Sequence, residues 1–163
     1  MKVKLASSLA ALACATAALG AEDRSCLAQS CVPGDRAITY ASRTEPFHAC
    51  PSAALAQYIA AVNQLVTLSI AITGKPPNIS VQTGEPEFAD DANGPNKTRV
   101  TLENFRHAAQ VDSYNQAVDR CTPGTTRRAV RILTTPERTS VVEVQDEQTQ
   151  AKYWMPKASL DKR

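Results

Sequence analysis

The chain has 163 residues, with 18 Lys and Arg against 16 Asp and Glu, and a formal net charge of +2. Two of the basic residues, Lys2 and Lys4, belong to a predicted leader, so the rest of the chain carries 16 basic and 16 acidic residues. A neutral domain lacks the positive field on which nucleic-acid binding depends. We therefore expect no nucleic-acid partner.

The first 21 residues have the three-part pattern of a secretory signal peptide. Lys2 and Lys4 precede an apolar run over residues 5–19, and Gly20 and Ala21 supply the small residues at which a signal peptide is cleaved. The apolar run is shorter than the roughly twenty residues of a membrane span. We expect cleavage near Gly20 or Ala21, a periplasmic or secreted mature chain, and no transmembrane span after cleavage.

A second interpretation of the leader concerns Cys14. Leu12-Ala13-Cys14 loosely resembles a lipoprotein signal, in which Cys14 would carry the lipid. In that pattern Leu normally stands three residues before the cysteine, and here Ala11 does. Lipidation of Cys14 is therefore kept as a minor alternative.

Residues 22–163 are long enough for one exported domain with a substantial core. Four cysteines remain in this part of the chain, at Cys26, Cys31, Cys50 and Cys121. An even number in an oxidising compartment indicates two disulfides. Three pairings are possible and the spacing does not choose among them; we favour Cys26–Cys31 with Cys50–Cys121.

Residues 36–42 predict a short strand, and residues 52–66 predict a helix with apolar side chains at helical spacing. Residues 66–73 fit either a continuation of this helix or a strand, because apolar and polar residues alternate there. The β-branched side chains in this stretch slightly favour some strand character. Gly74 is expected to end either element.

Residues 75–96 form a long connection rich in Pro and Gly. Thr101 is a plausible N-cap of a second, weaker helix, which restarts at Ser113 and runs to Cys121.

The last forty residues predict an antiparallel meander with strands over 129–133, 140–144 and 151–155. In the last of these strands, alternation places Tyr153 on one face of the sheet and Trp154 on the other. The predicted fold class is α+β, with one or two N-terminal helices, then a small C-terminal meander, stapled by disulfides.

Residues that could carry catalysis or bind a metal are sparse. His48 lies two residues from Cys50, so a Cys–His pair is conceivable, and the cysteines with His48 and His107 supply N and S ligands. No local motif surrounds them, and disulfide formation uses the same sulfurs. We therefore expect no catalytic residue, no metal ligand and no cofactor.

Two groups of residues are candidates for binding a partner. The long connection carries acids with no basic residue among them, so it could dock a basic partner; these are Glu85, Glu87, Asp90 and Asp91. The aromatic pair Tyr153 and Trp154 could stack on a ligand or partner, although a core role is the favoured interpretation.

The function predicted from the sequence is that of a small, exported, non-enzymatic binding protein, of the inhibitor, immunity or envelope accessory type. Its partner is expected to be another protein of the cell envelope or periplasm. The alternative is a component of an envelope secretion or conjugation assembly. A small hydrolase or a metal-binding protein is the third possibility.

Overall fold

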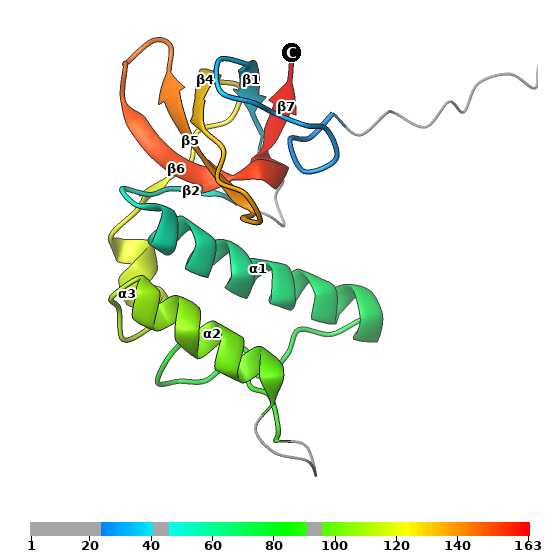
Figure 1. Cartoon of the computed structure of the whole chain (residues 1–163). Helices are drawn as coiled ribbons and strands as arrows, with labels where there is room; N and C mark the ends of the chain where they lie inside the picture. The colour runs from blue at the N-terminus through cyan, green and yellow to red at the C-terminus, as the bar shows by residue number, and fades with distance from the viewer. Residues whose placement is uncertain (1–23, 41–45, 91–95) are drawn as a thin grey trace, which may run out of the picture.

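The computed structural model describes residues 24–40, 46–90 and 96–163. In these residues the fold is α+β: a strand-built half and a helical half meet along the long helix α1 (Figure 1). The predicted signal peptide at residues 1–21, with Cys14, lies outside the described residues, as does Asp91.

The strand-built half is one five-stranded antiparallel sheet, in the order β6-β5-β4-β1-β7. A single 3₁₀ turn, η1, connects the two strands at opposite edges of this sheet. The strands are β1 (Arg36–Thr39), β4 (Ala129–Thr134), β5 (Val141–Asp146), β6 (Lys152–Pro156) and β7 (Leu160–Lys162), with η1 at Lys157–Ser159.

The predicted C-terminal meander is therefore present as β4, β5 and β6. The predicted order, helices first and sheet last, is only partly right, because strands β1 and β2 precede the helices. β1 pairs with both β4 and β7, so it is an inner strand of the sheet. A pairing across about ninety residues of chain leaves no local signal in the sequence.

One face of the sheet encloses the first of two hydrophobic clusters, which contains Val130, Val144 and Met155 and includes the Cys26–Cys31 disulfide. The other face of β5 and β6 contributes Val141 and Trp154 to the second cluster, which is built mainly by the helices. Both faces of this part of the sheet are thus covered.

All three helices lie between β1 and β4 in the chain, although these two strands are neighbours in the sheet. The helices are α1 (Ala53–Thr73), α2 (Lys97–Ala108) and α3 (Tyr114–Asp119). Residues 50–121 therefore form a helical insertion that leaves the sheet and returns to it (Figure 1).

The two ends of the helical insertion are held together at a narrow neck. There β2 (His48–Ala49) pairs with β3 (Thr122–Pro123), and the next residues, Cys50 and Cys121, form the second disulfide. The backbone of Cys50 also exchanges two hydrogen bonds with Trp154 of β6, at 2.9 and 2.8 Å. The neck is thereby fixed to the edge of the sheet. Both disulfides are the pairs favoured from the sequence.

α1 is a single helix from its cap at Ser52 to Gly74. The Ser52 side chain accepts a hydrogen bond from the Leu55 amide, and Gly74 adopts a left-handed conformation in which its N–H donates to the Ile70 carbonyl. Residues 66–73 are therefore helical, and the expectation of strand character there is wrong. The unbroken series of helical backbone hydrogen bonds and the glycine cap at the end of the helix outweigh the preference of β-branched side chains for strands.

α2 begins five residues earlier than predicted. The side chain of Asn96 accepts hydrogen bonds from the amides of Thr98 and Arg99, so Asn96 is the cap, while Thr101 lies inside the helix and donates to the Lys97 carbonyl. α3 begins as predicted, because Ser113 caps it through the amide of Gln116.

The turn after β5 is organised by the buried carboxylate of Asp146. It accepts hydrogen bonds from the Arg128 guanidinium, at 2.9 and 3.2 Å, and from the amides of Gln148 and Thr149. These donors, chiefly Arg128, lower the pKa of Asp146 to about 2.

Candidate functional site

α1 is 21 residues long, and among the helices of the described residues it alone has no charged side chain. Its fully buried residues all lie in the first half, between Leu55 and Val62. In its second half the apolar side chains are exposed: Leu68 by 51 %, Ile70 by 45 % and Ile72 by 74 %. The distal half of α1 therefore presents apolar surface that nothing in the described chain covers.

By length and composition alone α1 could also cross a membrane, with a mean hydropathy of 1.5 over an 18-residue window. The core helix of a globular domain passes the same test. The first half of α1 packs in the core with Val141 and Trp154 of the sheet. We therefore treat α1 as a core helix whose far end projects beyond the sheet, as Figure 1 shows.

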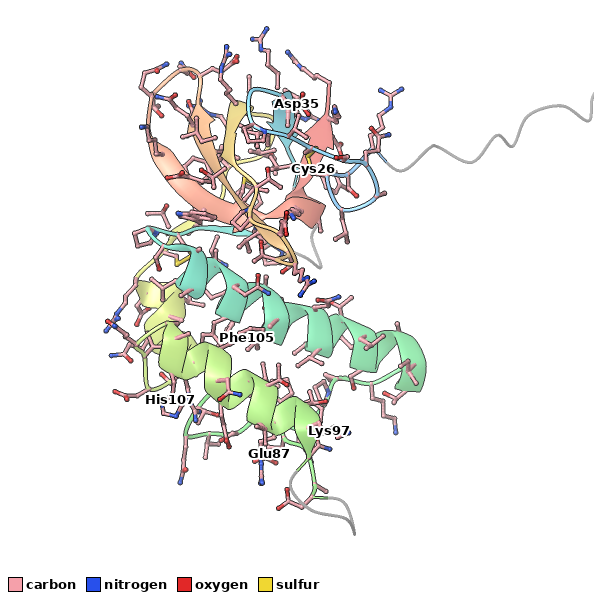
Figure 2. The ribbon with its side chains drawn as sticks, viewed as in Figure 1. Cys26, Asp35, Glu87, Lys97, Phe105 and His107 are labelled. Atoms are coloured by element: carbon pink, nitrogen blue, oxygen red, sulfur yellow. A yellow bond between two sulfur atoms is a disulfide. The ribbon has the colours of Figure 1, made fainter. Side chains whose placement is uncertain are left out.

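A groove of about 340 Å³ runs between α1 and α2. Its walls are mainly apolar side chains and threonines, and Phe105 lies between the two helices (Figure 2). We call this the α1–α2 groove; its main lining residues are Ala61, Leu65 and Leu68 of α1, and Thr98, Thr101 and Phe105 of α2. Leu102, which is buried, also contributes to the lining.

The long connection between α1 and α2 is anchored by a buried ion pair. The Glu85 carboxylate accepts a hydrogen bond from the Tyr58 hydroxyl at 2.7 Å and pairs with the Arg106 guanidinium at 3.0 Å. Burial, followed by the nearby Glu85 carboxylate, raises the pKa of Tyr58. Glu85 thus ties the connection to both α1 and α2 and is itself buried.

The acidic residues predicted to bind a partner are used differently by the structure. Glu85 is paired inside the fold, and Asp90 pairs with Arg99 of α2 at 2.7 Å. Among those that the structure describes, only Glu87 is exposed and makes no ion pair, and Figure 2 shows it on the far side of α2 from α1. Asp91 lies outside the described residues.

These pairs neutralise much of the charge of the connection. The sequence shows acids with no base among them, but the bases come from α2, which follows it. A hollow of about 780 Å³ between the connection and α2 contains in its lining the Arg106–Glu85 and Arg99–Glu103 pairs, beside Glu87 and neutral side chains. This reduces the net negative field that a basic partner would recognise.

The aromatic pair Tyr153 and Trp154 is divided between the two cores. Tyr153 packs on the cluster inside the sheet, and its pKa is raised to about 12, mainly by burial and then by Asp146. Trp154 packs on the helical cluster. The alternation predicted from the sequence is confirmed, and both side chains are partly buried in core positions.

The cysteines and histidines do not converge on a reactive centre. Cys26, Cys31, Cys50 and Cys121 are all in disulfides. Within residues 24–40, 46–90 and 96–163, no three His, Cys, Asp or Glu side chains are grouped so that they could hold a metal ion. Burial lowers the pKa of His48 in the neck, whereas His107 is exposed on α2 (Figure 2).

A polar hollow of about 410 Å³ lies on the outer face of the sheet. Arg36 of β1 stands directly opposite Arg131 of β4, and Glu147 contacts both guanidinium groups. The pairing, chiefly with Arg36, lowers the pKa of Glu147. This carboxylate offsets the repulsion that two like charges on facing strands would otherwise produce.

The α1–α2 groove was missed from the sequence, which predicted a helix over residues 52–66 without assigning a binding surface to it. The signal that could have found it is the absence of Asp, Glu, Lys and Arg from all 21 residues of α1. A helix that faces solvent along part of its length normally carries charge there.

Searches against protein-family models, curated proteins and solved structures found no match for the chain. The function has to be inferred from the structure itself.

Proposed function

We propose that this chain is an exported, non-enzymatic binding protein of the cell envelope, of the inhibitor, immunity or accessory type. The helical insertion carries its binding surface, at the α1–α2 groove and the distal half of α1. The observation that supports this best is α1 itself, a charge-free helix with three large apolar side chains exposed over its last two turns. Exposed apolar surface of this kind marks sites of protein association.

The disulfides support the proposed cellular compartment. Two disulfides indicate an oxidising, extracytoplasmic compartment. Together with the predicted signal peptide, they support a periplasmic or secreted location.

A binding role is also supported by how the cysteines are used. Catalysis by a cysteine needs a free thiolate next to a base. In the neck the sulfur of Cys50 is bonded to Cys121, although His48 lies only two residues away. The disulfide serves to hold the helical insertion, which presents the groove.

The alternative role, a component of an envelope secretion or conjugation assembly, needs at least two contact surfaces. The outer face of the sheet, with Arg36, Arg131 and Glu147, supplies a second and polar one. An inhibitor requires only the helical insertion, so the number of surfaces used separates the two roles.

The test is affinity capture of the mature protein from the native envelope fraction, after crosslinking, with partners identified by mass spectrometry. The informative variant is the triple change Leu68→Ser, Ile70→Ser and Ile72→Ser. Its control is Ile79→Ser with Val81→Ser, which changes exposed apolar side chains outside α1.

We expect one stoichiometric envelope partner with the wild type and the control, and its loss with the triple variant. Equal recovery by the triple variant would contradict the assignment of the surface to α1. A wild-type chain that recovers nothing above background would contradict the binding role.

A further inference from the structure

Four apolar side chains of α1 form a regular stripe, in which Ala61 and Leu65 are partly buried and Leu68 and Ile72 are exposed. Ala61, Leu65, Leu68 and Ile72 follow one another at intervals of four, three and four residues. At 3.6 residues per turn they lie within about 60° of one another around the helix axis. Intervals of this kind are those of the a and d positions at which two helices interlock. We call these four residues the α1 seam.

The helical insertion does not fill the α1 seam from within. α2 runs beside it and forms the other wall of the groove, but Leu68 and Ile72 remain 51 % and 74 % exposed. α2 begins at Lys97, near the level of Leu68, as the shared lining of the groove shows. The seam therefore lacks a helix on its open side.

We propose that the α1 seam packs against the α1 seam of a second copy of this chain, so that the helices α1 and α2 of two copies form a four-helix bundle. This rests on the assignment of the binding surface to the helical insertion and goes beyond the proposed function: the α1 seam takes a second copy, and the envelope partner binds the dimer. Two antiparallel helix pairs that meet across a two-fold axis are a common way to build such a bundle. The two sheets then lie outside the bundle and stay accessible.

Charge is the reason for choosing a second copy as the occupant. Close to a two-fold axis, a side chain meets its own equivalent in the other copy. A charged side chain at the centre of the interface would therefore face a like charge. α1 has no charged residue, and Gln64, Thr98 and Thr101 at the groove are neutral. Such a surface is complementary to itself.

Lys97 is the one charged residue among those that line the groove. It lies at the start of α2, beside the distal half of α1. When two α1 helices pack in antiparallel fashion, their distal halves point in opposite directions. The two Lys97 ammonium groups are then at opposite ends of the bundle, where both reach solvent.

A lipid surface is the main competing occupant for an exposed apolar helix. Helices that lie on membranes combine an apolar face with Lys and Arg on the other face. α1 has neither Lys nor Arg, and its neutral polar residues are Gln, Asn, Ser and Thr. The composition of α1 thus favours another helix over a membrane.

The experiment is sedimentation equilibrium of the purified mature chain, with both disulfides intact, over a wide concentration range. Leu68→Glu and Ile72→Glu each place a charge in the α1 seam. Ile79→Glu is the matched control, because Ile79 is an isoleucine that is also exposed, by 45 %, but lies outside α1 and outside the lining of the groove. Circular dichroism establishes that each variant is folded.

We expect a wild-type dimer, a dissociation constant raised at least about tenfold by each seam variant, and little change with Ile79→Glu. A monomeric wild type throughout the range overturns the proposal. So does equal weakening by Ile79→Glu, which indicates that the loss of association does not come from the α1 seam.

Two added measurements separate this proposal from its alternatives. Flotation with vesicles of phosphatidylglycerol and phosphatidylethanolamine would recover a monomeric chain if lipid is the occupant. Capture of an envelope partner by a monomeric wild type would leave the proposed function standing while the dimer fails. A dimer that captures no envelope partner would support the dimer and contradict the proposed function.

Discussion

The Cys50–Cys121 disulfide should contribute more to stability than Cys26–Cys31, because it closes a much longer loop. The paired cysteines are 71 residues apart in the first case and 5 in the second. Loop-closure entropy assigns about 4 kcal/mol to the longer loop and about 2 kcal/mol to the shorter one. In a domain of this size each kcal/mol corresponds to about 2–4 °C in Tm.

The comparison needs two double variants, Cys50→Ala with Cys121→Ala, and Cys26→Ala with Cys31→Ala. Alanine is preferred to serine because all four cysteines are buried, and an unpaired hydroxyl would add its own penalty. Thermal unfolding followed by circular dichroism should show a Tm lowered by roughly 10 °C for the first variant and by roughly half as much for the second.

The position of the disulfide at the neck gives a second readout. Without it, the ends of the helical insertion are held together by hydrogen bonds, chiefly those between β2 and β3. Amide hydrogen exchange should therefore accelerate in α2 and α3 more than in the five-stranded sheet. Equal or greater loss of stability on removing Cys26–Cys31 would refute the loop-length reasoning, and uniform acceleration of exchange would refute the view of the neck as a local clamp.

Two further changes test ion pairs. Asp146→Asn should make the free energy of unfolding depend less on pH. The pKa of Asp146 is about 2 in the folded protein, against an ordinary 3.8. The carboxylate therefore stabilises the fold above about pH 4, and this contribution is lost as the pH falls towards 2. Urea denaturation at pH 7 and pH 3 should differ by about 1 kcal/mol less in the variant than in the wild type, and an identical difference would count against the Arg128 pairing. Glu85→Gln should cost about 2–4 kcal/mol at neutral pH, because it leaves the largely buried Arg106 without its counter-charge. Glu87→Gln, at the exposed neighbour, should change the unfolding free energy little; equal effects of the two variants would mean that the buried pair does not stabilise the connection.

Elements with a local signal were predicted well from the sequence. Ser113 as a helix cap, the three strands of the meander, and the alternation of Tyr153 and Trp154 all depend on residues close together in the chain. The disulfide pairing was favoured correctly, although spacing alone allowed three arrangements.

Features that depend on distant residues were not predictable in the same way. The acids of the connection meet their bases only because α2 folds back along it, which brings Arg106 to Glu85 and Arg99 to Asp90. The position of β1 as an inner strand of the sheet depends on pairing with β4, across the whole helical insertion. In both cases the sequence shows the groups, and the tertiary fold decides their partners.

The distal half of α1 is not explained by the stability of the described fold. Residues 66–73 are rich in β-branched side chains, which form helices less readily than Ala, Leu, Glu or Lys. Leu68, Ile70 and Ile72 stay 51 %, 45 % and 74 % exposed, so they gain only part of the free energy of a fully buried side chain on folding. Neither helix propensity nor burial within the domain accounts for large apolar residues at these positions.

Burial against the proposed partner would account for them, and it leads to a sharp expectation. Polar substitution at Leu68 or Ile72 should leave the unfolding free energy of the isolated domain within about 0.5 kcal/mol of the wild type, while it weakens association. Urea denaturation at a concentration low enough to keep the chain monomeric measures the first quantity, and sedimentation measures the second. A large loss of monomer stability would mean that these side chains belong to the fold, and the case for a partner at the α1–α2 groove would lose its physical basis.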